Sequence, residues 1–310
     1  MKKIFISLAF SLGLLLTGCA KTTAINPANS VPIENYQPTE NYNLTLCCMK
    51  LGKADGMVIQ TENHTVVIDC GEKSDGSKMR RCLTALGVET IDYMILTHYD
   101  QDHIGGASKV IKYFDVAHVL APDYEHNNSN EFQKLSETMQ EKNLDFEFIT
   151  EDTAILLDDA EFDIYPCQAN SYKEGDDNNY SLITKLYHHD NIFLFTADAM
   201  YERLQEIMNI GDCTFLKEPY HGRELANLSN FLDAVTPEYA VISTSEEYLA
   251  DSTLEELEKR NIQTYITYQD GNMQFLSDGT TLQVTTGIEY PKLNSDSDDE
   301  ELENSADSLN

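Results

Sequence analysis

Two histidines and two aspartates lie within one short segment of this 310-residue chain and could together hold metal ions. They are His98, Asp100, Asp102 and His103, and two glycines, Gly105–Gly106, follow them. Imidazole nitrogens and carboxylate oxygens form a mixed ligand set that suits zinc, manganese or iron. Glycines permit the close backbone approach that a crowded metal site needs. The alternative is a polar loop that holds two histidines by chance.

Two later segments each end in a further possible ligand. The apolar run 191–197 precedes Asp198, and the run 215–219 precedes His221. The first ligand segment also follows an apolar run, 91–96, so each set of ligands is expected at the end of a buried strand. A two-metal hydrolytic centre needs ligands from several elements, because one carboxylate bridges two ions about 3.5–4 Å apart. The spacing therefore predicts such a centre at one edge of a sheet.

The elements that must position these ligands can be predicted from periodicity and turn residues. Strands are expected at 44–50, 56–60, 65–69, 93–97, 118–121, 145–149, 162–166, 181–188, 191–196, 213–217, 239–243, 263–267, 271–277 and 280–285. Helices are expected at 78–86, 107–114, 130–142, 201–208, 228–234 and 254–260. A meander of strands followed by strands that alternate with helices indicates two mixed sheets covered by helices.

Six motifs, in order along the chain, resemble those of the metallo-β-lactamase-fold hydrolases. They are Leu51–Gly56, Val66–Gly71, Leu96–Gly106, Asn178–Leu182, Phe195–Asp198 and Lys217–Gly222. The chain looks most similar to the extracellular hydrolase domain of the ComEC-type DNA-uptake competence proteins. This resemblance implies an α/β fold, the αββα four-layer sandwich, with a metal site at its edge.

For the first of two divalent ions, the resemblance implies His98 and Asp100 as ligands, with Asp198 bridging to the second ion. Asp100 stands where most of the superfamily has histidine, although the ComEC-like branch often has aspartate there. The histidine that normally completes this ligand set is absent before Leu182, and Asn179 is the nearest candidate in its place.

For the second ion, the resemblance implies Asp102, His103 and His221 as ligands. A metal-bound hydroxide would attack the substrate, and Asp102 would orient it, so Asp102 and His221 are the implied catalytic residues. The implied cofactors are two divalent ions of zinc or manganese, with iron as a further option. Tyr220 stands where the ComEC-like branch usually has another histidine, and the segment 243–247 has none.

These implied roles favour a metal-dependent hydrolase of a phosphodiester or another ester. A true β-lactamase is the first alternative, and Asp100 argues against it. A non-catalytic lipoprotein that binds a partner or a wall polymer is the second, and the absent histidines favour it. The formal net charge of −32 repels polyanions unless ions or a local basic patch offset the field. Charge therefore gives no support to nucleic-acid binding.

The two ends of the chain predict a surface-anchored domain. Residues 1–18 have a basic start and a short apolar run, which is typical of a secretory signal rather than a membrane span. The segment Leu16–Cys19 resembles the bacterial lipobox, which implies lipid attachment at Cys19 and a location on the extracellular face of the membrane. Residues 19–41 suit a flexible tether, 42–290 the hydrolase domain, and 291–310 an acidic disordered tail.

The remaining cysteines and histidines carry weaker predictions. A Cys70–Cys82 disulfide is plausible outside the cell, with free buried thiols as the alternative. His188 and His189 are expected to be solvated in a hairpin turn. His126 follows a predicted strand and could contact a substrate.

Overall fold

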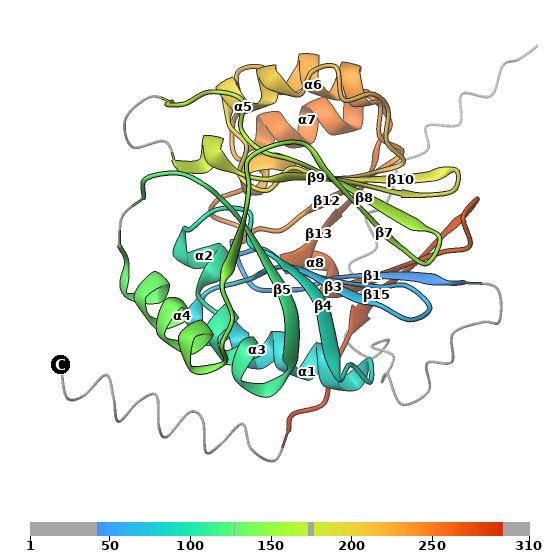
Figure 1. Cartoon of the computed structure of the whole chain (residues 1–310). Helices are drawn as coiled ribbons and strands as arrows, with labels where there is room; N and C mark the ends of the chain where they lie inside the picture. The colour runs from blue at the N-terminus through green and yellow to red at the C-terminus, as the bar shows by residue number, and fades with distance from the viewer. Residues whose placement is uncertain (1–41, 127, 173–176, 294–310) are drawn as a thin grey trace, which may run out of the picture.

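The computed structural model describes residues 42–126, 128–172 and 177–293. Over these residues the chain forms two β-sheets packed face to face, each covered on its outer side by helices (Figure 1). This order of layers confirms the predicted αββα sandwich. The predicted signal peptide, Cys19, the tether and residues 294–310 of the tail lie outside the described residues. None of the described helices has the length and apolar character needed to cross a bilayer.

The first sheet has eight strands. In spatial order they are β15 (Leu282–Ile288), β14 (Asn272–Ser277), β1 (Leu44–Cys48), β2 (Gly56–Gln60), β3 (Thr65–Cys70), β4 (Thr90–Ile95), β5 (Asp115–Pro122) and β6 (Phe146–Ile149). Pairing is antiparallel from β15 to β3 and parallel from β3 to β6. Parallel neighbours need crossover connections. Helices supply these crossovers, which places them on one face of the sheet.

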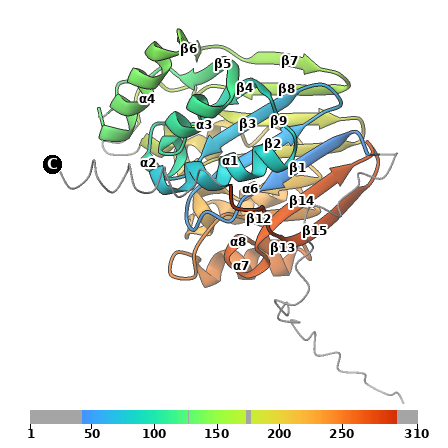
Figure 2. The same cartoon turned by 90° about the horizontal axis from the view of Figure 1, so that it is seen from below.

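The helices of this layer are α1 (Gly76–Ala85), α2 (Gln101–Ile104), α3 (Ala107–Tyr113) and α4 (Asn130–Glu141), preceded by the 3-10 turn η3 (Lys73–Asp75). Figure 2 shows α1, α3 and α4 lying across the first sheet. An apolar core between these helices and the sheet includes Met79, Leu83, Ile111 and Leu135. The short helix α2 is the next element after β4, and the predicted ligand segment begins in the loop between them, at the carboxyl end of this strand.

The second sheet has seven strands. In spatial order they are β13 (Gln263–Ile266), β12 (Tyr239–Ile242), β11 (Phe215–Lys217), β10 (Asn191–Phe195), β9 (Ile183–His188), β8 (Ala160–Tyr165) and β7 (Thr153–Leu157). The helices α5 (Tyr201–Glu206), α6 (Leu228–Val235) and α7 (Asp251–Lys259) connect its parallel strands and cover its outer face (Figure 1). The parallel strands β10 and β11 therefore end at the same edge of this sheet.

Apolar side chains from both sheets meet in a central core. Phe162, Phe195 and Phe275 are among its largest members. Successive side chains of a strand point to opposite faces of the sheet. In β1, Cys48 therefore lies in this central core, whereas Cys47 lies in the core beneath the outer helices. A strand buried on both faces reads as a continuous apolar run.

Three elements were not predicted from the sequence: β7, α2 and α8 (Thr267–Asp270). The helices α2 and α8 have four residues each, which is too short for a helical period to appear. Strand β7 is the edge of its sheet, and its side chain Leu156 is largely exposed. Its apolar content was therefore not enough to mark a buried strand.

Two predictions about side chains were wrong. The six described cysteines are all free, so no Cys70–Cys82 disulfide exists. The Cys82 thiol instead contacts the thiol of Cys47 and the Tyr290 hydroxyl. His188 is completely buried rather than solvated, and its Nδ1 lies 2.6 Å from the buried hydroxyl of Ser277 at the end of β14. The prediction that His189 is solvated is confirmed.

Candidate metal centre

The predicted ligands converge at one edge of the sandwich. His98 follows β4, Asp198 follows β10, and His221 follows β11 within the 3-10 turn η5 (Pro219–Gly222). Asp102 and His103 lie on α2, which begins three residues after His98. Because these elements belong to both sheets, the site lies where the two sheets meet.

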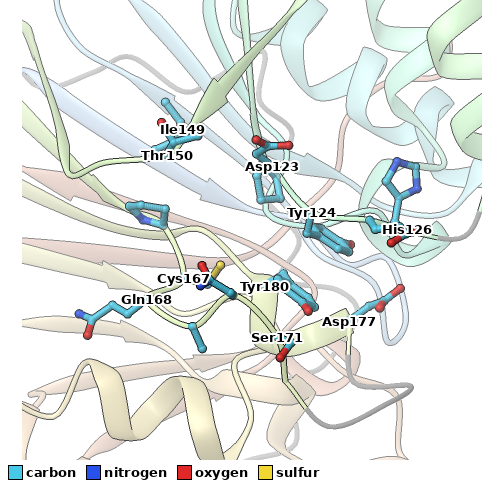
Figure 3. A pocket seen from close by; sticks show the side chains of 15 residues that line it. Asp123, Tyr124, His126, Ile149, Thr150, Cys167, Gln168, Ser171, Asp177 and Tyr180 are labelled. Carbon is cyan, nitrogen blue, oxygen red and sulfur yellow. The ribbon is translucent and has the colours of Figure 1, made fainter.

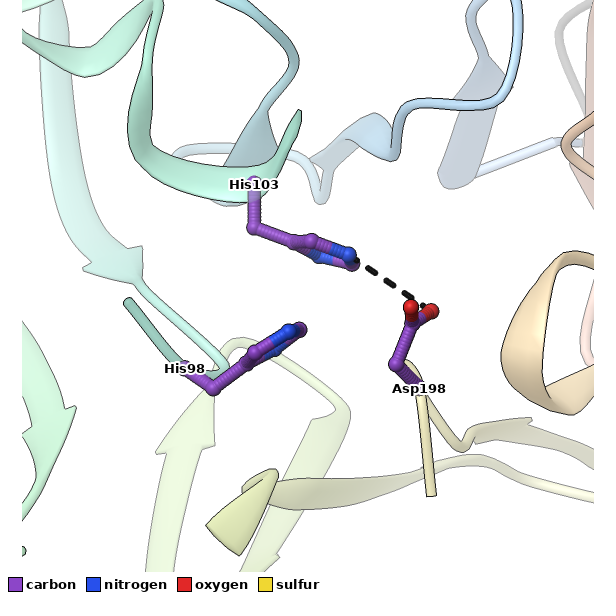
Figure 4. A group of neighbouring side chains, drawn as sticks. All are labelled: His98, His103 and Asp198. Carbon is purple, nitrogen blue, oxygen red and sulfur yellow. Dashed lines mark ion pairs between the residues drawn. The ribbon is translucent and has the colours of Figure 1, made fainter. Parts of the chain in front are cut away.

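A first set of ligand atoms comes from His98, His103 and Asp198, which point toward one another in Figure 4. The two imidazole centroids are 4.1 Å apart, and His103 Nε2 lies 3.5 Å from Asp198 Oδ1. Both Nε2 atoms and Asp198 Oδ1 are buried, and they have no hydrogen-bond partner in the described part of the chain. Such unpaired atoms destabilise a fold by about 1–3 kcal/mol each unless something binds them. Divalent cations held between these side chains would satisfy all three atoms.

A second set comes from Asp102, His103 and His221. His221 Nε2 lies 3.1 Å from Asp198 Oδ2 and 3.7 Å from Asp102 Oδ2. His221 Nδ1 donates a hydrogen bond to the carbonyl oxygen of Ser243 at 3.0 Å. That bond leaves the lone pair on Nε2, which points into the site. The two sets share His103, and Asp198 has one oxygen toward His103 and the other toward His221, an arrangement that suits a bridging carboxylate.

The remaining predicted ligand, Asp100, lies at the rim of the site. Its side chain is 46% exposed, and its Oδ2 is 3.7 Å from His98 Nε2. The nearby imidazole of His98 lowers the pKa of Asp100. Asn179, the suggested substitute for the absent histidine, is used elsewhere: its side-chain oxygen accepts hydrogen bonds from the backbone N–H groups of Met200 and Arg203. Asn179 therefore holds the start of α5 rather than facing an ion.

The side chain that orients His103 was not predicted. His103 Nδ1 donates to Asp69 Oδ2 at 2.8 Å, and Asp69 in turn accepts hydrogen bonds from the backbone N–H and the hydroxyl of Thr97, at 2.9 and 2.7 Å. A carboxylate behind a ligating histidine fixes its tautomer and raises its basicity. The sequence signal is an aspartate at the end of a fully buried strand, Thr65–Cys70.

Two lysines balance the charge of the acids. Lys217 Nζ is buried against Asp55 Oδ2 and lies 4.0 Å from Asp198 Oδ1. Burial opposes the charge of Lys217, but Asp55 and Asp198 outweigh it and raise the pKa of the ammonium group. Lys53 Nζ lies 2.6 Å from Asp102 Oδ2. No role for Lys53, Lys217 or Asp55 was predicted from the sequence.

Burial also opposes ionisation of Asp198, but the imidazoles of His221 and His103 outweigh it and hold the pKa of Asp198 well below its usual range. Asp198 is therefore a carboxylate at neutral pH. An anionic oxygen between two imidazole nitrogens is a strong ligand set for a divalent ion.

The backbone around the site adopts rare conformations. Asp69, Ala197, Tyr220 and His221 all have positive φ angles, of 57°, 46°, 50° and 53°. Left-handed conformations of non-glycine residues are unfavourable by roughly 1–3 kcal/mol each and gather at functional sites. They turn the chain sharply at the strand ends, which brings Asp198 and His221 together.

The two glycines after His103 pack as predicted. A Cβ atom at Gly106 would lie 2.2 Å from the carbonyl oxygen of Cys70, and one at Gly105 would lie 2.5 Å from the backbone nitrogen of Lys73. Only glycine allows α2 to approach the end of β3 this closely.

A cavity of about 900 Å³ opens beside the centre (Figure 3). Its wall includes the rings of Tyr124 and Tyr180, which are stacked at 4.3 Å, and the carboxylates of Asp123 and Asp177. Tyr124 Oη accepts a hydrogen bond from the backbone N–H of Tyr99, the residue after His98. The predicted substrate contact His126 also lines this cavity. Its role stays a prediction.

A family profile described as the Metallo-beta-lactamase superfamily matches residues 51–246. The chain therefore belongs to this superfamily, whose fold implies binding of divalent metal ions.

Curated relatives agree with the predicted resemblance. ComE operon protein 3 of Bacillus subtilis (strain 168) is 26% identical over 200 residues, which cover 62% of this chain and 25% of that protein. Hydroxyacylglutathione hydrolase of Aeromonas salmonicida (strain A449) is 35% identical over 68 residues, which cover 22% of this chain and 25% of that protein. The matched segments thus span about a quarter of these relatives.

Solved structures share the fold. The metallo-β-lactamase-fold protein YhfI from Bacillus subtilis has a TM-score of 0.50 and 10% identity, and the match covers 72% of this chain and 95% of that one. The E377D mutant of the β-hydroxylase CmlA has a TM-score of 0.50 and 14% identity, over 78% of this chain and 55% of that one. At these identities the matches establish the fold and not the substrate.

Proposed function

We propose that the chain is a metal-dependent hydrolase that acts on a phosphodiester or another ester. The observation that carries this proposal is the convergence of His98, His103, His221 and Asp198, whose buried ligand atoms face one another without hydrogen-bond partners in the described residues. When bound, two divalent ions would polarise the ester oxygen and make a water molecule more acidic.

Each residue of the site would have a separate role. Asp198 would hold both ions at the correct separation, and His221 and His103 would complete the second position. Asp102 would both ligate an ion and orient the attacking water. Lys53, whose ammonium group contacts Asp102, would lie beside the developing negative charge of the substrate.

Cationic side chains at the rim of the site support the proposal that the substrate is anionic. Lys53 is 30% exposed, and its ammonium group is 5.8 Å from the centre of the Tyr248 ring. The guanidinium of Arg223 stacks over the same ring at 4.5 Å. Two cations at the mouth of the site, in a chain of net charge −32, favour a small anionic ester. A long polyanion would meet the acidic remainder of the surface.

The test is turnover by the purified protein loaded with zinc or manganese. Bis-(p-nitrophenyl) phosphate, choline phosphate esters and nitrocefin would each be offered. We expect hydrolysis of a phosphate ester, with a Michaelis constant that rises roughly tenfold in Lys53→Gln because one charge contact to the substrate is lost. Turnover of nitrocefin alone would indicate a β-lactamase. Two tightly bound ions with no turnover of any ester would indicate the non-catalytic alternative.

We also propose that the domain is anchored by lipid on the extracellular face of the membrane. The support is the sequence Leu16–Cys19 after a short apolar run. Replacement Cys19→Ser should block processing or release the protein from the membrane fraction. A mature-size Cys19→Ser protein that stays in that fraction would contradict the anchor.

A further inference from the structure

A second group of histidine and aspartate side chains lies at the opposite edge of the sandwich. It consists of Asp159, His188 and His189, and we refer to it as the distal cluster. Strand β9 ends at His188 and β10 begins at Asn191, whereas Asp198 follows the other end of β10. The antiparallel hairpin therefore places the distal cluster far from the candidate metal centre. The turns between β9 and β10 and between β7 and β8 are at the right of Figure 1.

The ligand atoms of the distal cluster are spaced for a single ion. His189 Nε2 lies 2.9 Å from Asp159 Oδ2, and His188 Nε2 lies 3.6 Å from the same oxygen. Bonds of about 2.0–2.2 Å in a tetrahedral zinc site separate neighbouring ligand atoms by roughly 3.4 Å. The two observed distances lie on either side of that value. Small side-chain rotations would therefore suffice to bring all three atoms onto one ion.

His188 provides an independent reason to expect a ligand. Its side chain is completely buried, and its Nε2 has no hydrogen-bond partner among the described residues although it faces Asp159. Its Nδ1 lies 2.6 Å from the buried hydroxyl of Ser277, whose oxygen also accepts hydrogen bonds from Asn191 Nδ2 at 2.7 Å and from the backbone N–H of Gly279 at 3.1 Å. In the metal-binding tautomer, Nδ1 would donate to this oxygen and leave the lone pair on Nε2. A histidine whose second nitrogen is fixed by a hydrogen bond, and whose first is unpaired, is typical of a metal ligand.

We propose that the distal cluster binds one divalent ion of the zinc class. Two imidazoles and one carboxylate suit zinc, and water would supply the fourth ligand. His189 and Asp159 are 55% and 34% exposed, which leaves an open side for the ion and its water. Asp159 also accepts a hydrogen bond from Asn43 Nδ2 at 2.6 Å. A bound ion would therefore join two hairpin turns of the second sheet to the start of β1 in the first.

The competing explanation is a hydrogen-bonded His189–Asp159 pair that never binds an ion. Metal content per chain separates the two. We expect the wild-type protein, dialysed against micromolar zinc, to hold one ion more than Asp159→Asn or His189→Ala. The matched control is His118→Ala. His118 Nδ1 also contacts a carboxylate, Glu147 Oε1 at 2.6 Å, but within the described residues this exposed pair belongs to no potential metal-binding group. That variant should keep the wild-type content.

A second measurement uses stability. Added zinc should raise the melting temperature of the wild type and of His118→Ala by more than that of Asp159→Asn, because only an intact distal cluster gains a bound ion on folding. Equal metal content in the wild type, Asp159→Asn and His189→Ala would overturn the proposal. Circular dichroism of the isosteric Asp159→Asn variant checks that it is folded. Measuring metal content per chain does not require turnover. Ion binding at the distal cluster can therefore be tested even if the proposed hydrolase activity is not found.

Discussion

Both edges of the sandwich bring histidines and aspartates together, but they hold them differently. At the candidate metal centre, the charged carboxylate of Asp69 orients His103, and every ligand except Asp100 is buried. At the distal cluster, the neutral hydroxyl of Ser277 orients His188, and the other two members are partly exposed. A carboxylate makes the imidazole behind it a stronger ligand than a hydroxyl does. We therefore expect the candidate centre to hold its ions tightly and the proposed ion of the distal cluster to exchange more readily.

The two edges also differ in how the surrounding charge is balanced. Lys217 and Lys53 stand beside the acids of the candidate centre. At the distal cluster Asp159 contacts the neutral amide of Asn43 and the imidazole of His189. Two cationic side chains thus lie beside the acids at the first edge, as the proposed anionic substrate would require. At the second edge, no lysine or arginine forms an ion pair with Asp159 among the described residues.

The largest effect should come from making the same isosteric change at each edge. Asp198→Asn removes the bridging charge and should weaken the Lewis-acid contribution by several kcal/mol, which corresponds to a loss of roughly 10³-fold in kcat/KM for a phosphate ester. Asp159→Asn should leave kcat/KM within about twofold, since the distal cluster does not touch the reacting atoms. Steady-state kinetics of the two purified variants would measure this contrast. Equal losses would mean that the assignment of the catalytic edge is wrong.

A smaller effect should follow from removing the orienting carboxylate. Asp69→Asn keeps the size of the side chain but lowers the basicity of His103, so we expect metal affinity at the candidate centre to fall about 10–100-fold. Titration with a fluorescent chelator would report the affinity, and the melting temperature would report folding. Ser277→Ala, which removes the corresponding group at the other edge, should leave the affinity of the candidate centre unchanged. Unchanged affinity in Asp69→Asn would rule out the orienting role.

The smallest expected effect is on stability. It depends on the difference between two neighbouring residues at the candidate centre, Lys217 and Glu218. Lys217 is paired, whereas Glu218 is completely buried and its oxygens have no partner in the described chain. Burial raises the pKa of Glu218 to about 8. An unfolded glutamate has a pKa of about 4.3, so the folded state binds more protons between these values, and stability is lost as the pH rises from roughly 4.5 to 8.

Glu218→Gln removes that titration. The variant should gain roughly 2 kcal/mol over the wild type between pH 5 and pH 7, because each unit of pH contributes at most 1.4 kcal/mol and the slope falls off near each of the two pKa values. Urea unfolding at several pH values measures the difference. Parallel stability profiles for the two proteins would show that Glu218 is not protonated in the fold.

Much of the fold could be predicted because apolar periodicity and turn residues mark each long element. The ligands of the candidate centre could be predicted because four of them lie in one segment and the others follow apolar runs. The contacts of Asp69 and Lys217 could not, since they depend on which strands lie side by side. The distal cluster was missed for the same reason: His189 and Asp159 are 30 residues apart, and the hydroxyl beside His188 belongs to Ser277, 89 residues away.

The lysines of the candidate centre have a consequence for how the protein matures. Because Lys217 and Lys53 already neutralise part of the acidic charge, the domain does not need divalent ions to offset repulsion between its buried carboxylates. Small domains whose metal supplies their folding free energy unfold when a chelator removes it. This domain has large apolar cores on both faces of each sheet. It can complete folding first and take up its ions afterwards, so the supply of metal would set when the proposed hydrolase becomes active.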